Sequence, residues 1–181
     1  MKEPLVRLVR VATVALAAAI LSGCAELRVG SFIERGMDFT RYHTYNWSPD
    51  DQLLTGDPRL DNNSFFLERL QTDVDTQLAR KGFERTTSAT PDLLLHYHAN
   101  IWQQLDASAV DQRKFGLCAD CQPSLYYAGT LLLDFVDART NKLVWRGWAE
   151  GGLDNVIDNQ DRMEEKIDQA VTKILQRLPR L

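Results

Sequence analysis

Three cysteines and two closely spaced histidines are the residues of this chain whose side chains are best suited to chemistry. Cys24 stands at the end of an apolar run, whereas Cys118 and Cys121 are separated by only two residues. His96 and His98 flank a single residue in a run rich in leucine and aromatic residues. A thiol can carry a lipid, form a disulfide or bind a metal, and a neutral imidazole also binds metals.

The stretch that precedes Cys24 has the pattern of an export signal. Three basic residues stand among the first ten, and the uncharged apolar stretch 11–21 follows them. The small residues Ser22 and Gly23 then lead to Cys24, as a narrow cleavage site requires. The apolar stretch is shorter than the about 20 residues that a bilayer-spanning helix needs, so residues 1–23 are predicted to be a signal peptide.

Leu21-Ser22-Gly23-Cys24 resembles the lipobox of bacterial lipoproteins. The resemblance implies cleavage before Cys24, diacylglycerol on its sulfur and an acyl chain on its amine. Two or more acyl chains hold a protein stably on a membrane, whereas one chain holds it only marginally. In lipoproteins of enteric-type bacteria, Asp after the lipidated cysteine retains the protein at the inner membrane, and this chain has Ala25. The resemblance therefore implies an anchor in the inner leaflet of the outer membrane, facing the periplasm.

The mature chain is acidic and has the length of one domain. Removal of residues 1–23 leaves 158 of the 181 residues, enough for a single hydrophobic core. The leader takes three bases and one acid with it, so the formal net charge changes from −4 to about −6. This charge argues against binding to nucleic acid or electrostatic adhesion to an anionic surface.

The pattern of apolar residues predicts an α+β domain over residues 38–181, after a lipidated tether and first short strand in 24–37. Two apolar stripes at helical spacing are expected, Leu67, Leu70, Val74 and Leu78 before Gly82, and Met163, Ile167, Val171, Ile174 and Leu178 before Pro179. Asp161 with Glu164 is a plausible capping pair for the second helix. The expected strands are 29–33, 39–47, 93–105, 126–136 and 142–150, the last two joined as a hairpin.

These elements favour a two-layer sandwich with a mostly antiparallel sheet. Each helix has a single apolar stripe, so both helices are expected to pack on one face of the sheet. The other face would then stay open to water or to a partner.

Several short stretches follow one another in a set order: Asp38-Phe39, Tyr42-His43-Thr44-Tyr45-Asn46-Trp47, Lys81-Gly82-Phe83, Pro91-Asp92-Leu93, Gly129-Thr130-Leu131, Asp137-Ala138 and Leu143-Val144-Trp145-Arg146-Gly147. Together with the lipobox, their order and spacing resemble the bacterial lipoprotein family known as domain of unknown function 4136. The resemblance covers most of the mature chain. It implies an exported, membrane-anchored α+β domain, and it implies no reaction and no catalytic residue.

Cys118 and Cys121, which are not part of that family pattern, allow two interpretations. In an oxidising compartment two cysteines this close usually form a disulfide, which would stiffen one corner of the polar loop 106–124. Alternatively, His96 and His98 share one face of a strand, and two thiolates would complete a tetrahedral zinc site with them. That site requires the loop to return the cysteines to the face of the histidines.

Trp145 and Trp148 are three residues apart on an expected strand, so one should lie in the core and the other outward. An outward tryptophan beside Tyr126 or Tyr127 would form a contact surface. The alternative is that the second helix covers it.

The sequence thus predicts a non-enzymatic binding or structural protein of the cell envelope. Its partners would be the bilayer, through acylated Cys24, and an unknown envelope protein, cell-wall or lipid component. The alternative is a periplasmic metal-binding, zinc-type or redox-linked module that uses Cys118, Cys121, His96 and His98.

Overall fold

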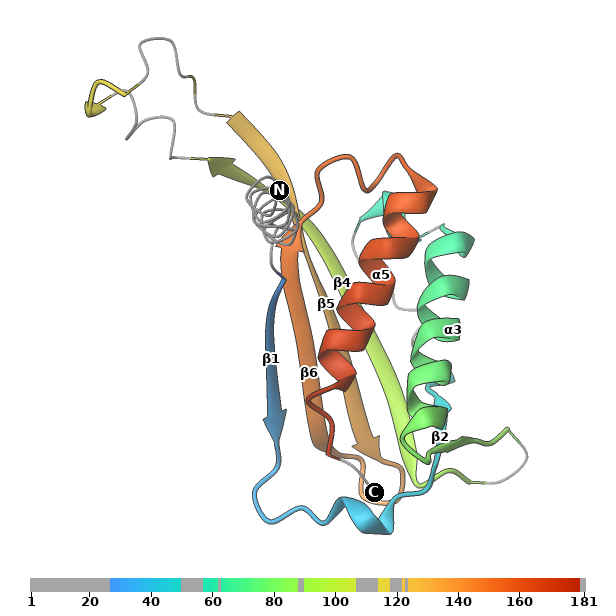
Figure 1. Cartoon of the computed structure of the whole chain (residues 1–181). Coiled ribbons are helices and arrows are strands. Elements are labelled where there is room, and N and C mark those ends of the chain that lie inside the picture. Colours follow the sequence, from blue (N-terminus) through green and yellow to red (C-terminus); the bar gives the residue numbers. More distant parts are fainter. Residues whose placement is uncertain are drawn as a thin grey trace, which may run out of the picture.

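The computed structural model describes residues 27–49, 57–61, 63–87, 90–106, 114–117, 122 and 124–179. In this part of the chain a six-stranded sheet carries two long helices on one face (Figure 1). None of the helices within these ranges is long and apolar enough to cross a membrane. The signal peptide, Cys24, Cys118 and Cys121 lie outside the described residues, so what was predicted of them stays a prediction.

The elements follow one another along the chain as β1 (Arg28–Ile33), the 3-10 helix η2 (Phe39–Arg41), β2 (Thr44–Trp47), α2 (Pro58–Asp61), α3 (Ser64–Arg80), β3 (Glu84–Arg85), β4 (Leu93–Asp106), β5 (Ser124–Asp137), β6 (Lys142–Gly152) and α5 (Gln160–Leu175). The strand order in the sheet is β1-β6-β5-β4-β2-β3. β2 runs parallel to β3 and β4, and the other neighbours are antiparallel. The predicted α+β fold with a mostly antiparallel sheet is therefore confirmed.

Residues 39–47, predicted as one strand, form η2 and β2 instead. Asp38 caps η2, because its carboxylate accepts hydrogen bonds from the backbone N–H and the hydroxyl of Thr40 at 3.0 and 2.7 Å. This turn directs Tyr42 into the core, where its hydroxyl donates to Asp137 at 3.0 Å. The aromatic residues of this stretch thus reflect burial as much as strand structure.

Asparagine side chains start both long helices. Asn63 and Asn159 each accept a hydrogen bond at 3.0 Å from a backbone N–H in the first turn of the helix that follows. The capping pair Asp161 and Glu164 is wrong, because α5 already begins at Gln160 and Asn159 satisfies its first turn.

The core lies between the helices and the inner face of the sheet. The predicted apolar stripes face it, with buried side chains at Leu70, Val74, Leu78, Met163, Ile167, Val171 and Ile174. Leu67, predicted as the first stripe residue of α3, is only half-buried, and Phe66 lies in the core in its place. Leu178, predicted as the last stripe residue of the second helix, follows the end of α5 and is nevertheless buried.

Trp145 is the largest fully buried side chain. Its ring meets Phe135 edge-on, with the ring centroids 5.2 Å apart. Gly147 leaves room for this ring, since a Cβ at that position would lie only 2.2 Å from it. The same Cβ would lie 2.6 Å from Ile174 of α5, so strand and helix approach closely here.

A β-bulge decides which side chains of β6 face the helices. The pairing register slips by one residue between Phe135 and Val136 of β5, which leaves Val144 of β6 as the extra residue. Past the bulge, Trp145 lies in the core and Trp148 lies on the opposite face of the strand. The prediction of one inward and one outward tryptophan is confirmed.

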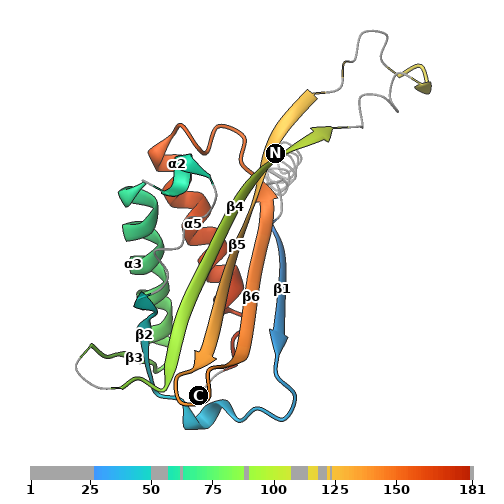
Figure 2. The same cartoon turned by 180° about the vertical axis from the view of Figure 1, so that it is seen from behind.

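β4 and β5 continue beyond the rest of the sheet as a two-stranded extension (Figure 1 and Figure 2). β6 ends with Gly152 opposite Ala128, whereas β4 and β5 stay paired as far as Asp106 and Ser124. We call the described residues 103–106, 114–117 and 124–127 the hairpin arm.

Candidate functional site

The helices that the structure describes leave one face of the sheet uncovered, as Figure 2 shows from behind. Two rows of register partners cross this face in the strand order β4, β5, β6 and β1. The rows are His96–Asp134–Arg146–Phe32 and His98–Leu132–Trp148–Gly30. We call these two rows the outer-face patch.

An ion pair lies at the centre of the outer-face patch. Arg146 Nε donates to Asp134 Oδ1 at 2.6 Å, and a terminal guanidinium nitrogen donates to the other carboxylate oxygen. The Asp134 side chain is 7% exposed and that of Arg146 is 40% exposed. The hydrogen bond to Asp134 raises the pKa of Arg146. Two of the five guanidinium N–H groups face the carboxylate, which leaves donors on the exposed edge for a partner.

Trp148 lies beside this ion pair and covers Gly30 of β1. A Cβ at Gly30 would lie 2.1 Å from the indole ring, so the glycine is what allows the ring to lie against the edge strand. Trp148 is half-buried and belongs to the outer-face patch. Trp145, which was also a candidate contact residue, is fully buried and cannot meet a partner.

The two tyrosines predicted beside the outward tryptophan lie elsewhere. Trp148 pairs with Leu132, which is six residues along β5 from Tyr126, a distance of about 20 Å. Tyr127 faces α2, where the guanidinium carbon of Arg59 lies 4.6 Å from its ring centroid. The predicted patch of tryptophan with tyrosine is therefore wrong, because the aromatic residues occupy different levels and faces of the sheet.

His96 and His98 share the uncovered face, as the alternation of a strand requires. His98 is exposed, and its Nε2 lies 3.8 Å from an oxygen of Asp134. Within the described ranges, no group of three or more His, Cys, Asp or Glu residues is placed to hold a metal ion. The other two predicted ligands, Cys118 and Cys121, lie outside those ranges.

The strand register bears on the predicted zinc site. Ser124, three residues after Cys121, pairs with Asp106, which is eight residues along β4 from His98. Eight strand residues span about 26 Å, whereas three residues of chain reach at most about 11 Å. This register disfavours a zinc ion shared by the cysteines and histidines of one chain.

We expect Cys118 and Cys121 to be joined by a disulfide in an oxidising compartment. Thiol titration of the denatured chain carrying Cys24→Ala, in which Cys118 and Cys121 are the remaining cysteines, should find no thiol before reduction and two after it. Because the closed loop is short, reduction should lower the free energy of unfolding by no more than about 2 kcal/mol. One zinc ion per chain together with two reduced thiols would contradict this expectation.

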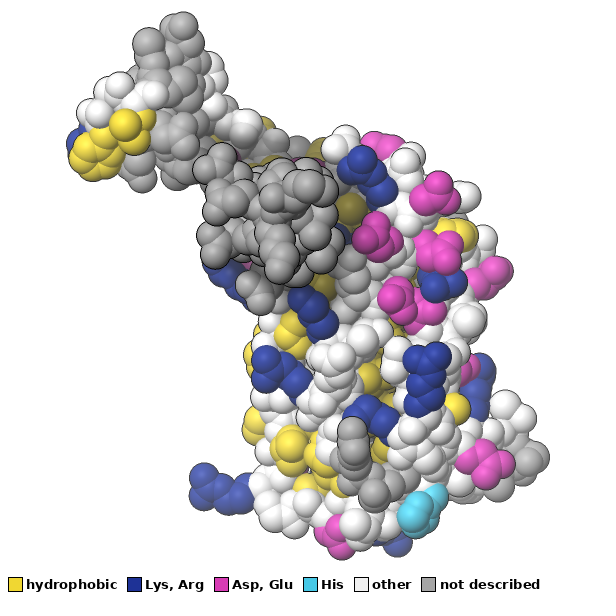
Figure 3. All heavy atoms as spheres, viewed as in Figure 1, with side chains coloured by type: hydrophobic (Ala, Val, Ile, Leu, Met, Phe, Trp, Pro, Cys, Tyr) yellow, Lys and Arg dark blue, Asp and Glu magenta, His cyan; other side chains and the backbone are white. Residues whose placement is uncertain are grey.

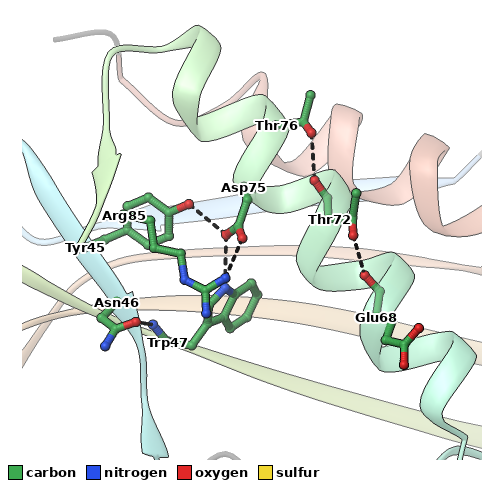
Figure 4. Close-up of polar contacts among 8 residues, drawn as sticks. All are labelled: Tyr45, Asn46, Trp47, Glu68, Thr72, Asp75, Thr76 and Arg85. Carbon is green, nitrogen blue, oxygen red and sulfur yellow. Dashed lines mark hydrogen bonds and ion pairs between the residues drawn. The ribbon is translucent and has the colours of Figure 1, made fainter. Parts of the chain in front are cut away.

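Asp75 of α3 binds two side chains of β2 and one of β3 (Figure 4). Its Oδ1 accepts hydrogen bonds from the Tyr45 hydroxyl at 2.7 Å and from Trp47 Nε1 at 3.0 Å. Its Oδ2 accepts from Arg85 at 2.8 Å. Burial, reinforced by the hydrogen bond to Asp75, raises the pKa of Tyr45, so its hydroxyl remains a donor. The carboxylate is occupied by donors of this chain and holds the edge strands against the helix.

A second carboxylate, Asp137, fixes the turn between β5 and β6. It accepts hydrogen bonds from the Tyr42 hydroxyl at 3.0 Å and from the backbone N–H groups of Arg139 and Thr140, each at 2.9 Å. Burial alone would raise the pKa of Asp137, but the hydrogen bonds from Thr140, Tyr42 and Arg139 outweigh burial and lower it. This carboxylate is also occupied by its own chain and serves the fold.

An apolar cavity of about 80 Å³ lies between the sheet and the helices. Leu27, Leu153 and Ile167 are among its lining residues, and Lys166 is its one basic residue. Sites for drug-sized ligands measure about 300–1,000 Å³, so this cavity is too small for one. Leu27 fills the space beside Gly151, where a Cβ would lie 2.6 Å from the leucine side chain. The packing of Leu27 at the edge of this cavity thus fixes the start of β1.

The helix side of the molecule has a different character from the outer-face patch. Figure 3 shows acidic side chains gathered over the N-terminal half of α5 and basic ones towards its other end. The acidic residues there are Asp161, Glu164, Glu165 and Asp168, and the basic ones are Lys173 and Arg177. This distribution complements the helix dipole and produces a solvated, charged surface.

A family model described as domain of unknown function, DUF4136, matches residues 31–180. The chain belongs to the DUF4136 family. The predicted membership of this family is confirmed, whereas the lipobox at residues 21–24 lies outside the match and stays a prediction. The match includes the outer-face patch except Gly30. No curated protein matches this DUF4136 chain.

Solved structures with a similar fold include a PDZ domain protein from Parabacteroides distasonis, with a TM-score of 0.54 and 14% identity. The match covers 91% of this chain but only 39% of that larger chain. A DUF4136 family protein from Bacteroides thetaiotaomicron has a TM-score of 0.49 at 12% identity, over 81% of this chain and 94% of that one. PelC, in a dodecamer from Paraburkholderia phytofirmans, has a TM-score of 0.46 at 12% identity, over 83% and 95%. These likenesses concern the fold alone.

Proposed function

We propose that this DUF4136 protein is a lipid-anchored protein of the bacterial cell envelope that acts by binding a protein partner across its uncovered sheet face. The lipobox at residues 21–24 would supply the anchor, and Ala25 favours the outer membrane. The observation that carries the binding role is the outer-face patch, where Arg146 and Trp148 remain accessible beside exposed His98.

The composition of the patch suits a protein partner. Arginine and tryptophan are the residues that most often dominate binding energy at protein interfaces. Asp134 already holds the Arg146 side chain in one orientation, which reduces the ordering cost of binding. Phe32, 45% exposed on the edge strand, adds apolar area to the same face. A fitting partner presents a hydrogen-bond acceptor to Arg146 and an apolar side chain to Trp148 or Phe32.

The buried position of Leu27 supports a close attachment of the domain to the membrane. Leu27 is buried against Gly151, so only Ala25 and Glu26 separate this fixed point from Cys24. Three residue steps span at most about 11 Å. A lipid on Cys24 would therefore hold the end of the sheet near the bilayer. The uncovered face of the sheet would then stand at an angle to the membrane surface and stay open to a partner.

Site-specific photo-crosslinking tests this role in the full-length protein in its own cells. A photoreactive phenylalanine analogue is placed at His98 or Phe32 of the uncovered face and, as matched controls, at Glu165 or Asp168, which are exposed on α5. We expect the same envelope protein to be captured from both uncovered-face positions and from neither α5 position.

The added substitution Trp148→Ser should lower capture from the His98 position roughly tenfold, since it removes a central aromatic contact. Circular dichroism of this variant checks that the fold is retained. Equal capture from the α5 positions, or no capture from the uncovered face, would contradict the proposed role.

A further inference from the structure

The hairpin arm exposes large apolar side chains to solvent. Leu105 and Leu125 are register partners and are 55% and 66% exposed. Phe115 and Leu117, farther out on the arm, are 73% and 77% exposed. Figure 3 shows hydrophobic side chains at the far end of the arm, clear of the body of the domain. Four large apolar side chains exposed on one projecting segment mark a surface for a protein or a membrane.

The arm leaves the sheet at the end where the tether to Cys24 enters (Figure 1 and Figure 2). Leu27 packs against Gly151, which pairs with Gly129 of β5. From Gly129 the strand continues for five residues to Ser124, about 17 Å. The tether from Leu27 back to Cys24 spans at most about 11 Å. The arm is therefore longer than the tether beside it.

We propose that the hairpin arm is a second membrane contact, whose apolar side chains enter the interfacial layer of the leaflet that holds the lipid on Cys24. This inference rests on the proposed lipid anchor. With that anchor in place the bilayer begins nearer to Leu27 than the arm extends, so an upright domain brings the arm into the lipid. Phe115 and Leu117 are side-chain types that partition into this layer.

One basic side chain of the arm suits a lipid surface. Lys114, next to Phe115, is exposed at the outer end of the arm. A lysine can bury its aliphatic stem while its ammonium group stays among lipid phosphates. Because the anchor already holds the arm at the membrane, the contact is intramolecular and needs only weak intrinsic affinity. The arm would set the tilt of the domain and hence the direction in which the outer-face patch points.

Lipid photolabelling tests the inference. The full-length lipidated protein is reconstituted in vesicles of phosphatidylethanolamine and phosphatidylglycerol that contain a phospholipid with a photoreactive acyl chain. Labelled peptides are mapped by mass spectrometry. We expect label on the peptides that contain Leu105, Phe115, Leu117 and Leu125, in addition to the lipidated N-terminal peptide.

Matched double variants sharpen the result. Phe115→Ser with Leu117→Ser should lower arm labelling roughly tenfold, because two apolar side chains no longer favour the lipid. Phe32→Ser with Ile33→Ser, which changes two side chains 45% and 42% exposed at the far end of β1, should leave arm labelling unchanged. Both variants should still float with the vesicles through Cys24.

The outcomes separate this inference from the proposed function. If Cys24 carries lipid and the protein floats but the arm is unlabelled, the arm contact is overturned and the anchor stands. If Cys24 is unmodified and the protein does not float, the anchor fails and the arm inference falls with it. Cross-links between the arms of two copies, without lipid label, would assign the arm to self-association and also overturn the inference.

Discussion

Replacement of Trp145 with Ala is expected to lower the free energy of unfolding by about 4 kcal/mol. The side chain is fully buried, meets Phe135 edge-on and fills the space left by Gly147 against α5. Alanine would leave a cavity at a place where β6 and α5 approach closely. Urea denaturation of the full-length protein, followed by far-UV circular dichroism, measures the change.

Two variants control for the loss of an indole ring. Trp148→Ala, on the same strand but half-buried on the uncovered face, should cost less than about 2 kcal/mol. Trp145→Phe should also cost much less than Trp145→Ala, because it keeps an aromatic ring. It removes an indole N–H that has no hydrogen-bond acceptor among the residues that the structure describes. Equal losses for Trp145→Ala and Trp148→Ala would show that the two faces are equally packed, against this structure.

Replacement of Asp75 with Ala is expected to lower the free energy of unfolding by about 3 kcal/mol. The substitution leaves the Tyr45 hydroxyl and Trp47 Nε1 without their common acceptor and removes the ion pair with Arg85 (Figure 4). Tyr45 is nearly inaccessible to solvent, so water cannot readily replace the lost acceptor. The same denaturation measurement applies.

Glu68→Ala is the matched control, because Glu68 is an exposed acid of α3 drawn in the same view with no side-chain partner there. It should change the free energy of unfolding by less than about 0.5 kcal/mol. Tyr45→Phe removes one of the three hydrogen bonds and should cost about 1 kcal/mol. A loss for Asp75→Ala no larger than that for Glu68→Ala would mean that the carboxylate does not hold β2 and β3 against α3.

Periodicity was sufficient to predict the helices and the long strands. The stripes that include Leu70, Val74 and Ile167 each make one buried face, and burial of that face is what selects the helix. The hairpin of β5 and β6 was predictable for the same reason, since a short polar turn separates two runs of β-forming residues. Asn63 and Asn159, which cap the two helices, are local signals for a helix start. Asp161 with Glu164 was a competing signal for the start of α5.

The outer-face ion pair could not be predicted, because it depends on the bulge. A hairpin closed by Asp137 and Lys142 without any slip would place Asp134 opposite Trp145. The extra residue on β6 shifts the register so that Arg146 meets the carboxylate instead. Packing of Trp145 into the core selects this shift, and packing is a tertiary effect that residue spacing does not encode. The hairpin arm was not predicted for a related reason. That β4 and β5 extend beyond the sheet is visible only once the end of β6 is known.

The N-terminus of the mature protein decides most directly whether a lipid holds this DUF4136 domain at a membrane. Mass spectrometry of the protein purified from its own envelope, after trypsin cleavage at Arg28, measures it. We expect a peptide of residues 24–28 that begins at Cys24, with diacylglycerol on the sulfur and an acyl chain on the amine, and Cys24→Ala should abolish both the cleavage and the lipid. A mature chain that still begins at Met1, or a Cys24 without lipid, would contradict the proposed anchor.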